Sequence, residues 1–388
     1  MRYGIGAWGL AVAVAVFALA SHADPLPAGY WHQPLAPQGT APSSWSEQER
    51  SLKPEDCGLC HADKLAEWRT SLHAKAFSPG LVGQLLSLDV EEARSCMNCH
   101  APLAEQMAAF EAARARGKGH VPWEQGLAAA GNSCGGCHVR EHRRFGPSQR
   151  DSGQAGVGSP DAPHGGVIRS TDFEKSDFCA VCHQFPQDQA INGKPLENTV
   201  VEWRASPAAA EGKTCQSCHM PGRRHLWRGI HDPDMVRSGL TAEFIADSRR
   251  ARFRLTSTGV GHAFPTYVTP KVVMAGVALD AAGRPVAGTM RRHVIQRRVE
   301  VVNGEWVERF DTRLSPGETA VLDMPWPAGG RVRFWLEVHP DDFYDHDVYD
   351  GLLAGLPGKS PAARLIAEAD AQAGRNRFRL FETLVSRP

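Results

Sequence analysis

Apolar and polar residues alternate in the second half of the chain, and this pattern predicts short strands. In residues 331–339 the alternation directs four apolar side chains to one face: Val332, Phe334, Leu336 and Val338. Asn303-Gly304 joins two strand-like runs and is a strong hairpin signal. With the runs KVVMAGVALD and ETAVLDM, these strands predict a small β-sandwich-like domain over residues 251–345. His339 falls on the polar face, where we expect it to be solvated.

A helical period occurs on both sides of this region. In DKLAEWRTSLHAKAF, Leu65, Trp68 and Leu72 share one face of a predicted helix, and His73 flanks that face. Near the C-terminus, Ser360 at the N-cap and Pro361 at the first position predict a terminal helix. The predicted fold class is α+β: a mainly helical and loop domain at residues 51–250, the β-sandwich-like domain, and a C-terminal helical segment at residues 346–388.

The N-terminal residues predict export from the cytoplasm. An uncharged apolar run follows Arg2, and small residues provide cleavage sites near Ala20 or Ala23, so residues 1–23 are interpreted as a secretory signal peptide. An uncleaved membrane anchor is the alternative, although the run is short for a bilayer span. Residues 24–50 are rich in proline and predict an arm laid over the surface. We expect a soluble, periplasmic or otherwise exported chain.

Composition limits the classes of partner. The 388 residues suffice for two or three domains, and a hydrophobic content of 42% is ordinary for a globular protein. Lys+Arg and Asp+Glu balance at 43 each. The chain therefore has no net charge that would indicate nucleic acid or an anionic membrane surface as a partner.

All ten cysteines occur in five CxxCH sequences, the signature of c-type haem attachment. Each pair of thiols forms thioethers to one haem: Cys57 and Cys60, Cys96 and Cys99, Cys134 and Cys137, Cys179 and Cys182, Cys215 and Cys218. The histidine that follows each pair is the expected proximal iron ligand: His61, His100, His138, His183 and His219. A disulfide framework would not explain five histidines in register, zinc sites would need CxxC units to combine, and a thioredoxin-like motif would not occur five times.

The spacing of the motifs predicts close packing of the cofactors. Successive first cysteines lie 36–45 residues apart, too few for an independent core around each haem. We therefore expect five covalently attached haem c groups that supply much of the core and lie close to one another, as electron transfer along a chain of cofactors requires.

The sixth ligand of each haem iron is expected among the remaining histidines. The candidates are His73, His164, His225, His231 and His262. Pro221, Gly222 and Gly229 favour a reversal that returns His225 or His231 to a haem face. His262, in GVGHAFPT, would latch the β-domain onto the haem domain. His120 and His142 are substitutes, and His32 is expected to be solvated.

A short internal echo accompanies these histidines. EWRTSLH at residues 67–73 and EWRASPA at residues 202–208 share tryptophan, arginine and serine in register, but Ala208 stands where the first segment has His73. The segments are either copies of a duplicated unit, of which one lost a ligand, or a coincidental surface pattern.

The runs FCAVCHQF, CQSCHMPGRRHLWRGIHDP, CHADKLAEWRTSLHAKAF and GVGHAFPT resemble periplasmic multihaem c-type cytochromes over roughly residues 51–270. Members of that family include the tetrahaem electron acceptor of hydroxylamine oxidoreductase and, more distantly, that enzyme and the pentahaem nitrite reductases. The resemblance implies mainly bis-histidine haems in close-packed pairs, with His73 and His225 as distal ligands. The reductases carry lysine in one haem motif, and no CxxCK occurs here, so their activity is not implied.

Two functional classes follow. The favoured one is an electron carrier that links donor and acceptor redox proteins. Its fixed partner would be a membrane-bound quinol-oxidising complex or an outer-membrane electron conduit. The alternative is an oxidoreductase with one five-coordinate haem that acts on a small nitrogen or sulfur species.

Overall fold

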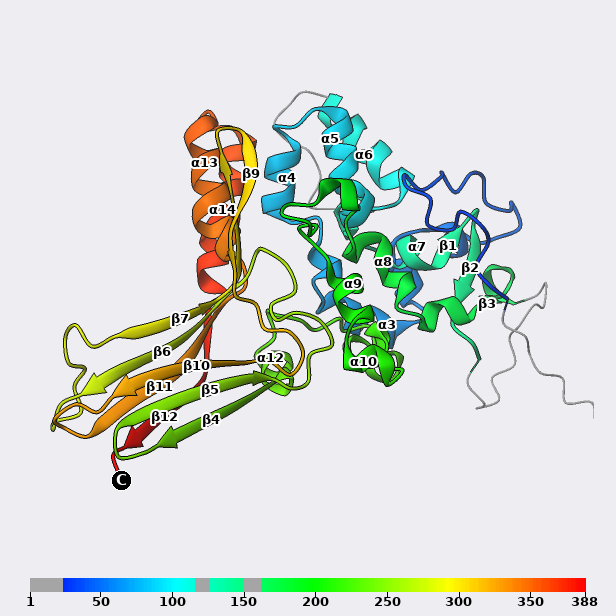
Figure 1. Ribbon diagram of the computed structural model, residues 1–388. Coiled ribbons are helices and arrows are strands. Elements are labelled where there is room, and N and C mark those ends of the chain that lie inside the picture. The colour runs from blue at the N-terminus through cyan, green and yellow to red at the C-terminus, as the bar shows by residue number, and fades with distance from the viewer. Residues whose placement is uncertain (1–23, 116–125, 150–161) are drawn as a thin grey trace, which may run out of the picture.

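The computed structural model describes residues 24–115, 126–149 and 162–388, so the predicted signal peptide and His120 lie outside the described residues (Figure 1). The helices of the haem-motif region are α1 (Glu47–Arg50), α2 (Pro54–Gly58), α3 (Ala62–Arg69), α4 (Pro79–Leu85), α5 (Val90–His100), α6 (Ala104–Ala115), α7 (Cys134–His138), α8 (Asp177–His183), α9 (Thr199–Arg204), α10 (Pro207–Ala210), α11 (Cys215–His219) and α12 (Pro233–Gly239). Two helices lie near the C-terminus: α13 (Tyr349–Gly355) and α14 (Pro361–Arg375).

The strands form four small sheets. They are β1 (Val139–Arg140), β2 (Arg143–Gly146), β3 (Ile168–Arg169), β4 (Leu240–Ala246), β5 (Arg250–Ser257), β6 (Lys271–Leu279), β7 (Arg291–Ile295), β8 (Arg297–Val302), β9 (Glu305–Asp311), β10 (Thr319–Pro325), β11 (Arg331–His339) and β12 (Phe378–Ser386). The orders are β1-β2-β3, β10-β5-β4, β12-β11-β6-β7 and β8-β9. The α+β class predicted from the sequence is confirmed, with the helical region first and the strands after it.

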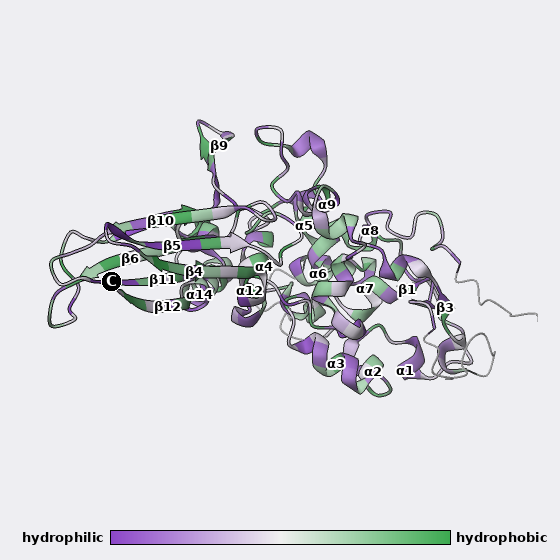
Figure 2. Ribbon diagram, turned by 60° about the horizontal axis from the view of Figure 1, so that its bottom comes forward, coloured by the Kyte–Doolittle hydropathy of each residue, from purple (hydrophilic) through white to green (hydrophobic). Residues whose placement is uncertain are grey.

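Two of these sheets pack face to face as a β-sandwich. Their shared core includes Phe253 of β5, Met274 of β6 and Met324 of β10. The four apolar residues predicted to share a face of residues 331–339 are all fully buried in this core: Val332, Phe334, Leu336 and Val338. Figure 2 shows the hydrophobic colouring along β6, the strand beside β11. The sandwich begins at β4, before the predicted boundary at residue 251.

The second face of β11 is not the solvated face that alternation predicts. Trp335 is 5% exposed and packs in a small cluster with Ala275 and Val277. Arg379 lies over its ring at 4.9 Å. On the same face His339 lies 3.6 Å from a carboxylate oxygen of Glu337. The alternation sets which side chains share a face, but it does not show that neighbouring strands cover that face as well.

The C-terminal segment is partly helical and partly strand. Helix α14 begins as predicted, with the Ser360 side chain accepting a hydrogen bond from Ala363 N and Pro361 at the first position. The chain then returns as β12, which pairs antiparallel with β11, so the expectation of a helical segment up to residue 388 is corrected. Figure 1 shows α14 beside α4 of the haem-motif region. A Cβ atom at Gly83 would lie 2.7 Å from Ile366, so the two helices approach closely there.

The predicted hairpin is present, but it stands apart from the sandwich. Asn303 and Gly304 both have positive φ, as the tight turn between β8 and β9 requires. Arg297, fully buried, donates to the carbonyl oxygens of Ile191 and Lys194 at 2.9 and 2.8 Å. The hairpin therefore docks on the loop that follows the fourth CxxCH motif.

The proline-rich arm lies over the haem-motif region, in line with the surface-arm expectation. The Tyr30 hydroxyl donates to Cys137 O at 2.7 Å, and the Gln33 amide donates to Asn98 O at 2.8 Å. Both acceptors belong to CxxCH motifs. Leu35 is 4% exposed, and His32 is exposed.

Candidate haem sites

The five CxxCH motifs, numbered here as sites 1 to 5 in chain order, lie at the ends of short helices. The motifs of sites 2, 3, 4 and 5 lie within α5, α7, α8 and α11, and each of these helices ends at the motif histidine. Residues three and four apart share one helix face, so both thiols and the imidazole of a motif point to the same side. This is the arrangement needed to attach and ligate one haem.

Three motif histidines face a second histidine from a distant part of the chain. The ring centroids of His138 and His225 lie 6.1 Å apart, those of His183 and His73 lie 6.2 Å apart, and those of His219 and His262 lie 6.3 Å apart. The pairs belong to sites 3, 4 and 5. His225, His73 and His262 were all predicted as distal ligands.

The spacing of these pairs fits one iron atom between two imidazoles. A metal ion lies about 2 Å from an imidazole nitrogen, and a ring centre lies about 1.1 Å from its own nitrogen, so two imidazoles that share an ion have centroids about 6.2 Å apart. Direct stacking of two rings would allow a closer approach. The three observed distances therefore match a bis-histidine iron site.

Hydrogen bonds leave one nitrogen of these rings available to a metal. Nδ1 lies on a main-chain carbonyl oxygen in His138 (Phe145 O, 2.8 Å), His219 (Arg228 O, 2.6 Å), His225 (Arg223 O, 3.2 Å) and His262 (Ala263 O, 2.9 Å). A carbonyl oxygen accepts a proton, so Nδ1 carries it and Nε2 keeps its lone pair. Burial is the largest cause that lowers the pKa of His73 to about 3 and the pKa of His225 and His262 to about 4. These rings are neutral at neutral pH, as iron ligands must be.

Glutamates anchor the loops that carry His225 and His262. Glu67 accepts from His225 N at 2.8 Å, and Glu202 accepts at 3.2 Å from the N–H of Ala263, the residue after His262. The two glutamates open the EWR segments noted in the sequence. The two EWR segments therefore make the same kind of contact: the glutamate of each accepts a backbone hydrogen bond from the loop that carries the second histidine of site 3 or site 5.

The tryptophans of the same segments contact the proximal side of the same two sites. Trp68 Nε1 donates to Asn132 O and Trp203 Nε1 donates to Lys213 O, each at 2.9 Å. Each acceptor lies two residues before a CxxCH motif. With the glutamate contacts, this supports the duplicated-unit interpretation over a coincidental pattern. His73, in the first segment, faces His183 of site 4, and Ala208 replaces it in the second.

The tryptophan contacts differ in burial, which gives a prediction. We expect Trp68→Phe to lower the free energy of unfolding by about 1–2 kcal/mol, because it removes the hydrogen bond of a buried indole to Asn132 O. Trp203→Phe, at a half-buried position, should cost about 0.5 kcal/mol. Urea unfolding of the two variants measures both values. Equal losses would contradict the burial argument.

The remaining predicted ligands have different surroundings. Nδ1 of His164 lies 3.0 Å from Gly166 O, and the Glu49 carboxylate accepts from His164 N at 2.8 Å. Burial is the largest cause that lowers the pKa of His164, and the charges of Arg144 and then of His61 lower it further, so His164 lies in the surroundings of both residues. His231 Nε2 instead lies 2.9 Å from Asp341 Oδ1. That contact occupies Nε2, while Nδ1 is buried without a hydrogen-bond partner, so the ligand role of His231 stays a prediction.

Sites 1 and 2 differ from the other three, because no ring contact among the described residues places a second imidazole opposite His61 or His100. Nδ1 of His100 lies 3.1 Å from Ala76 O, which again leaves Nε2 free. The substitute candidate His142 is held at the arm, with Nε2 3.1 Å from Gly39 O.

Contacts between motifs show which sites are neighbours. Thiols of three pairs of motifs lie close together, because in each pair one thiol is the largest cause that shifts the pKa of the other: Cys57 with Cys134, Cys99 with Cys182, and Cys179 with Cys215. These contacts join site 1 to site 3, site 2 to site 4, and site 4 to site 5. Trp227 joins sites 3 and 4, because its ring centroid lies 5.0 Å from that of His225 and 4.7 Å from that of His73.

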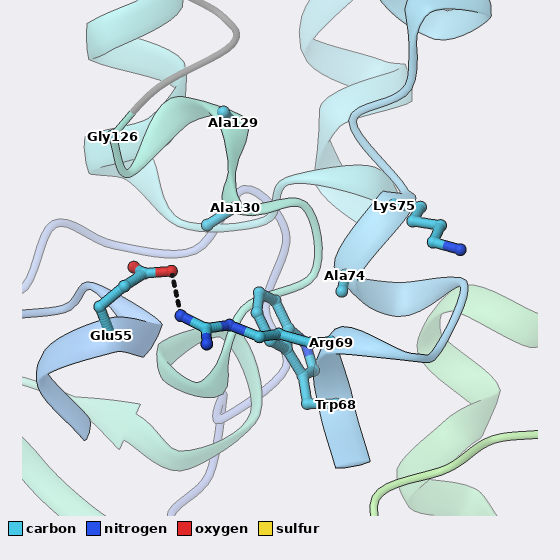
Figure 3. Close-up of a pocket in the computed structure, with 8 residues that line it drawn as sticks. All are labelled: Glu55, Trp68, Arg69, Ala74, Lys75, Gly126, Ala129 and Ala130. Atoms are coloured by element: carbon cyan, nitrogen blue, oxygen red, sulfur yellow. Dashed lines mark hydrogen bonds and ion pairs between the residues drawn. The ribbon is translucent and has the colours of Figure 1, made fainter. Parts of the chain in front are cut away.

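A surface pocket of about 440 Å³ lies beside the first EWR segment (Figure 3). Trp68, Ala74 and Ala130 line it, together with Arg69, which forms an ion pair with Glu55 at 3.4 Å. The pocket adjoins the residues that position site 3. None of the predicted ligands lines it.

Two comparisons with known proteins gave matches. Residues 56–139 match the family model described as cytochrome c554 and c-prime. The structure is similar to the crystal structure of a penta-heme cytochrome c552 from Thermochromatium tepidum, with a TM-score of 0.57 and 20% sequence identity, over 81% of this chain and 97% of that chain. No curated protein matches the sequence. No helix among the described residues is long and apolar enough to cross a membrane.

Proposed function

We propose that this chain is a periplasmic pentahaem c-type cytochrome that transfers electrons between redox partners, which its match over residues 56–139 and the fold that it shares with a penta-heme cytochrome support. The observation that carries the proposal is the set of three imidazole pairs at 6.1, 6.2 and 6.3 Å. When bound, haem c supplies reversible one-electron chemistry, and two imidazoles close its iron to substrates. A haem whose iron is closed in this way can pass electrons but cannot bind a substrate, as in an electron carrier.

The proposed ligand sets follow the facing pairs. The thiols of each motif hold one haem c. His138 and His225 ligate at site 3, His73 and His183 at site 4, and His219 and His262 at site 5. For site 1 we propose His61 with His164, supported by their electrostatic contact and by the free Nε2 of His164.

The contacts between motifs support a branched route for electrons. Site 4 is the centre, because its thiols contact those of sites 2 and 5 and Trp227 links it to site 3. Site 1 is reached through site 3. Cys60 of site 1 and Cys218 of site 5 are the exposed cysteines of the chain, so we propose that donor and acceptor proteins dock there. A quinol-oxidising membrane complex or an outer-membrane conduit would fit such partners, as would the electron-accepting role that the hydroxylamine oxidoreductase resemblance implies.

A specific observation favours the second candidate function, at site 2. Within the described residues neither His61 nor His100 has a facing imidazole. With His164 proposed for site 1, the haem of site 2 is the one that would be open to a small nitrogen or sulfur species. His120 lies outside the described residues, and its presence opposite His100 would return site 2 to the carrier class.

Spectroscopy of the purified, haem-loaded protein tests both candidates. Pyridine haemochrome analysis should give five covalent haems per chain. Low-temperature EPR of the oxidised protein should show low-spin haem for sites 1, 3, 4 and 5. A high-spin signal that changes with nitrite or hydroxylamine would assign an enzymatic role to site 2. Fewer than three low-spin haems would contradict the carrier proposal.

A further inference from the structure

His183 of site 4 differs from the other motif histidines in what its Nδ1 contacts. Its Nδ1 lies 2.8 Å from Glu197 Oε1. Main-chain carbonyl oxygens occupy that place at sites 2, 3 and 5. A carboxylate is charged and accepts a hydrogen bond more strongly than a neutral carbonyl. The ring of His183 is therefore more electron-rich than those of His100, His138 and His219.

Glu197 is held in place by main-chain contacts on both sides. Its carbonyl oxygen accepts from Phe185 N at 2.9 Å, two residues after His183. Its backbone also forms an isolated antiparallel bridge with Tyr267, in the segment that follows His262. The side chain is only 19% exposed. The orientation of the carboxylate towards His183 is therefore set by both domains.

The charge of Glu197 is not neutralised by a basic side chain. Among the described residues, His183 is its ion-pair partner, and no lysine or arginine nitrogen lies within 4.0 Å of it. Although burial lowers the pKa of His183, the charge of Glu197 and the hydrogen bond to it raise that pKa above its ordinary value. Burial and then the charge of Glu197 raise the pKa of Tyr267. The carboxylate acts as a local negative charge beside site 4.

We propose that Glu197 is a positioning residue that makes the haem of site 4 the lowest of the five in reduction potential. This inference rests on the proposed function, in that site 4 must hold haem c ligated by His183. An electron-rich axial imidazole stabilises ferric iron over ferrous iron, and hydrogen bonding to a ligand is one way a protein sets the potential. Because site 4 is the centre of the branched route, electrons fill the outer haems before the centre.

Glu197→Gln in the haem-loaded full chain tests the proposal by potentiometric titration monitored optically. At a fixed potential, the ferric-to-ferrous ratio of the lowest-potential haem should fall at least about tenfold, a rise of about 59 mV for a one-electron couple. The potential of the site 2 haem should rise less, because the charge of Glu197 also acts on His100, and the haems of sites 1, 3 and 5 should keep their potentials. That haem is identified as site 4 if it is the one that becomes high-spin in His73→Ala. Glu197→Asp retains the charge but places it farther from His183, so the reduction potential should rise by a smaller amount.

Glu211→Gln is the matched control for the loss of one carboxylate. Glu211 is 58% exposed and pairs with Lys213 near site 5. An equal rise in this control, or unchanged potentials in Glu197→Gln with five haems bound, would overturn the proposal. Fewer than five haems in the wild-type chain, or no low-spin haem at site 4, would instead contradict the proposed function, and the haem count and EPR separate the two failures.

Discussion

Replacing His262 with alanine will convert the haem of site 5 from low-spin to high-spin, because the ring that faces His219 at 6.3 Å is then absent. The reduced variant should bind one more carbon monoxide per chain than the wild type, since carbon monoxide needs an open iron position. The optical change on carbon monoxide addition measures this number. An unchanged number would remove His262 from the ligand set.

The same substitution should also weaken the contact between the two domains. Besides His262, the segment of residues 259–270 is held to α9 by the Glu202 contact and by a 2.7 Å hydrogen bond between Thr199 and Thr266 hydroxyls. Loss of the iron bond should lower the free energy of unfolding by about 1–3 kcal/mol, the usual range for a residue that joins packed units. Thr199→Ala should cost about 1 kcal/mol while leaving carbon monoxide binding unchanged. A spin-state change in Thr199→Ala would contradict the assignment of Thr199 to the domain contact alone.

Replacing His73 with alanine should have the second large effect, at the centre of the route. His73 faces His183 at 6.2 Å and contacts Trp227, so its loss opens the haem of site 4 and leaves the contact between sites 3 and 4 incomplete. We expect one additional carbon monoxide per chain. We also expect slower reduction of the remaining haems by a protein donor, measured in stopped flow.

His231→Ala is the matched control for both histidine variants. His231 was predicted from the sequence as a distal ligand, but its Nε2 contacts Asp341 at 2.9 Å. The variant should therefore bind no additional carbon monoxide. One additional molecule bound would restore His231 as an iron ligand and would require a different partner assignment.

Local spacing explains which parts of the structure were predictable. The CxxCH motifs, the hairpin at Asn303-Gly304 and the buried face of β11 each depend on residues within a few positions of one another. The predicted helix from residue 63 to residue 77 was only half correct, because α3 ends at Arg69 and Leu72 is 46% exposed. The strand β12 was not predicted, because it is defined by its pairing with β11, a tertiary contact that its own sequence does not indicate.

By itself, then, the sequence determined the number and positions of the CxxCH motifs and which side chains of each motif can act together, because two thiols and an imidazole at i, i+3 and i+4 share one helix face wherever that helix lies. Only the tertiary structure decided which distal histidine faces which motif, and that Glu197 rather than a carbonyl contacts His183. Those pairs join residues far apart in the chain, and their meeting depends on how the arm, the haem domain and the β-domain pack together.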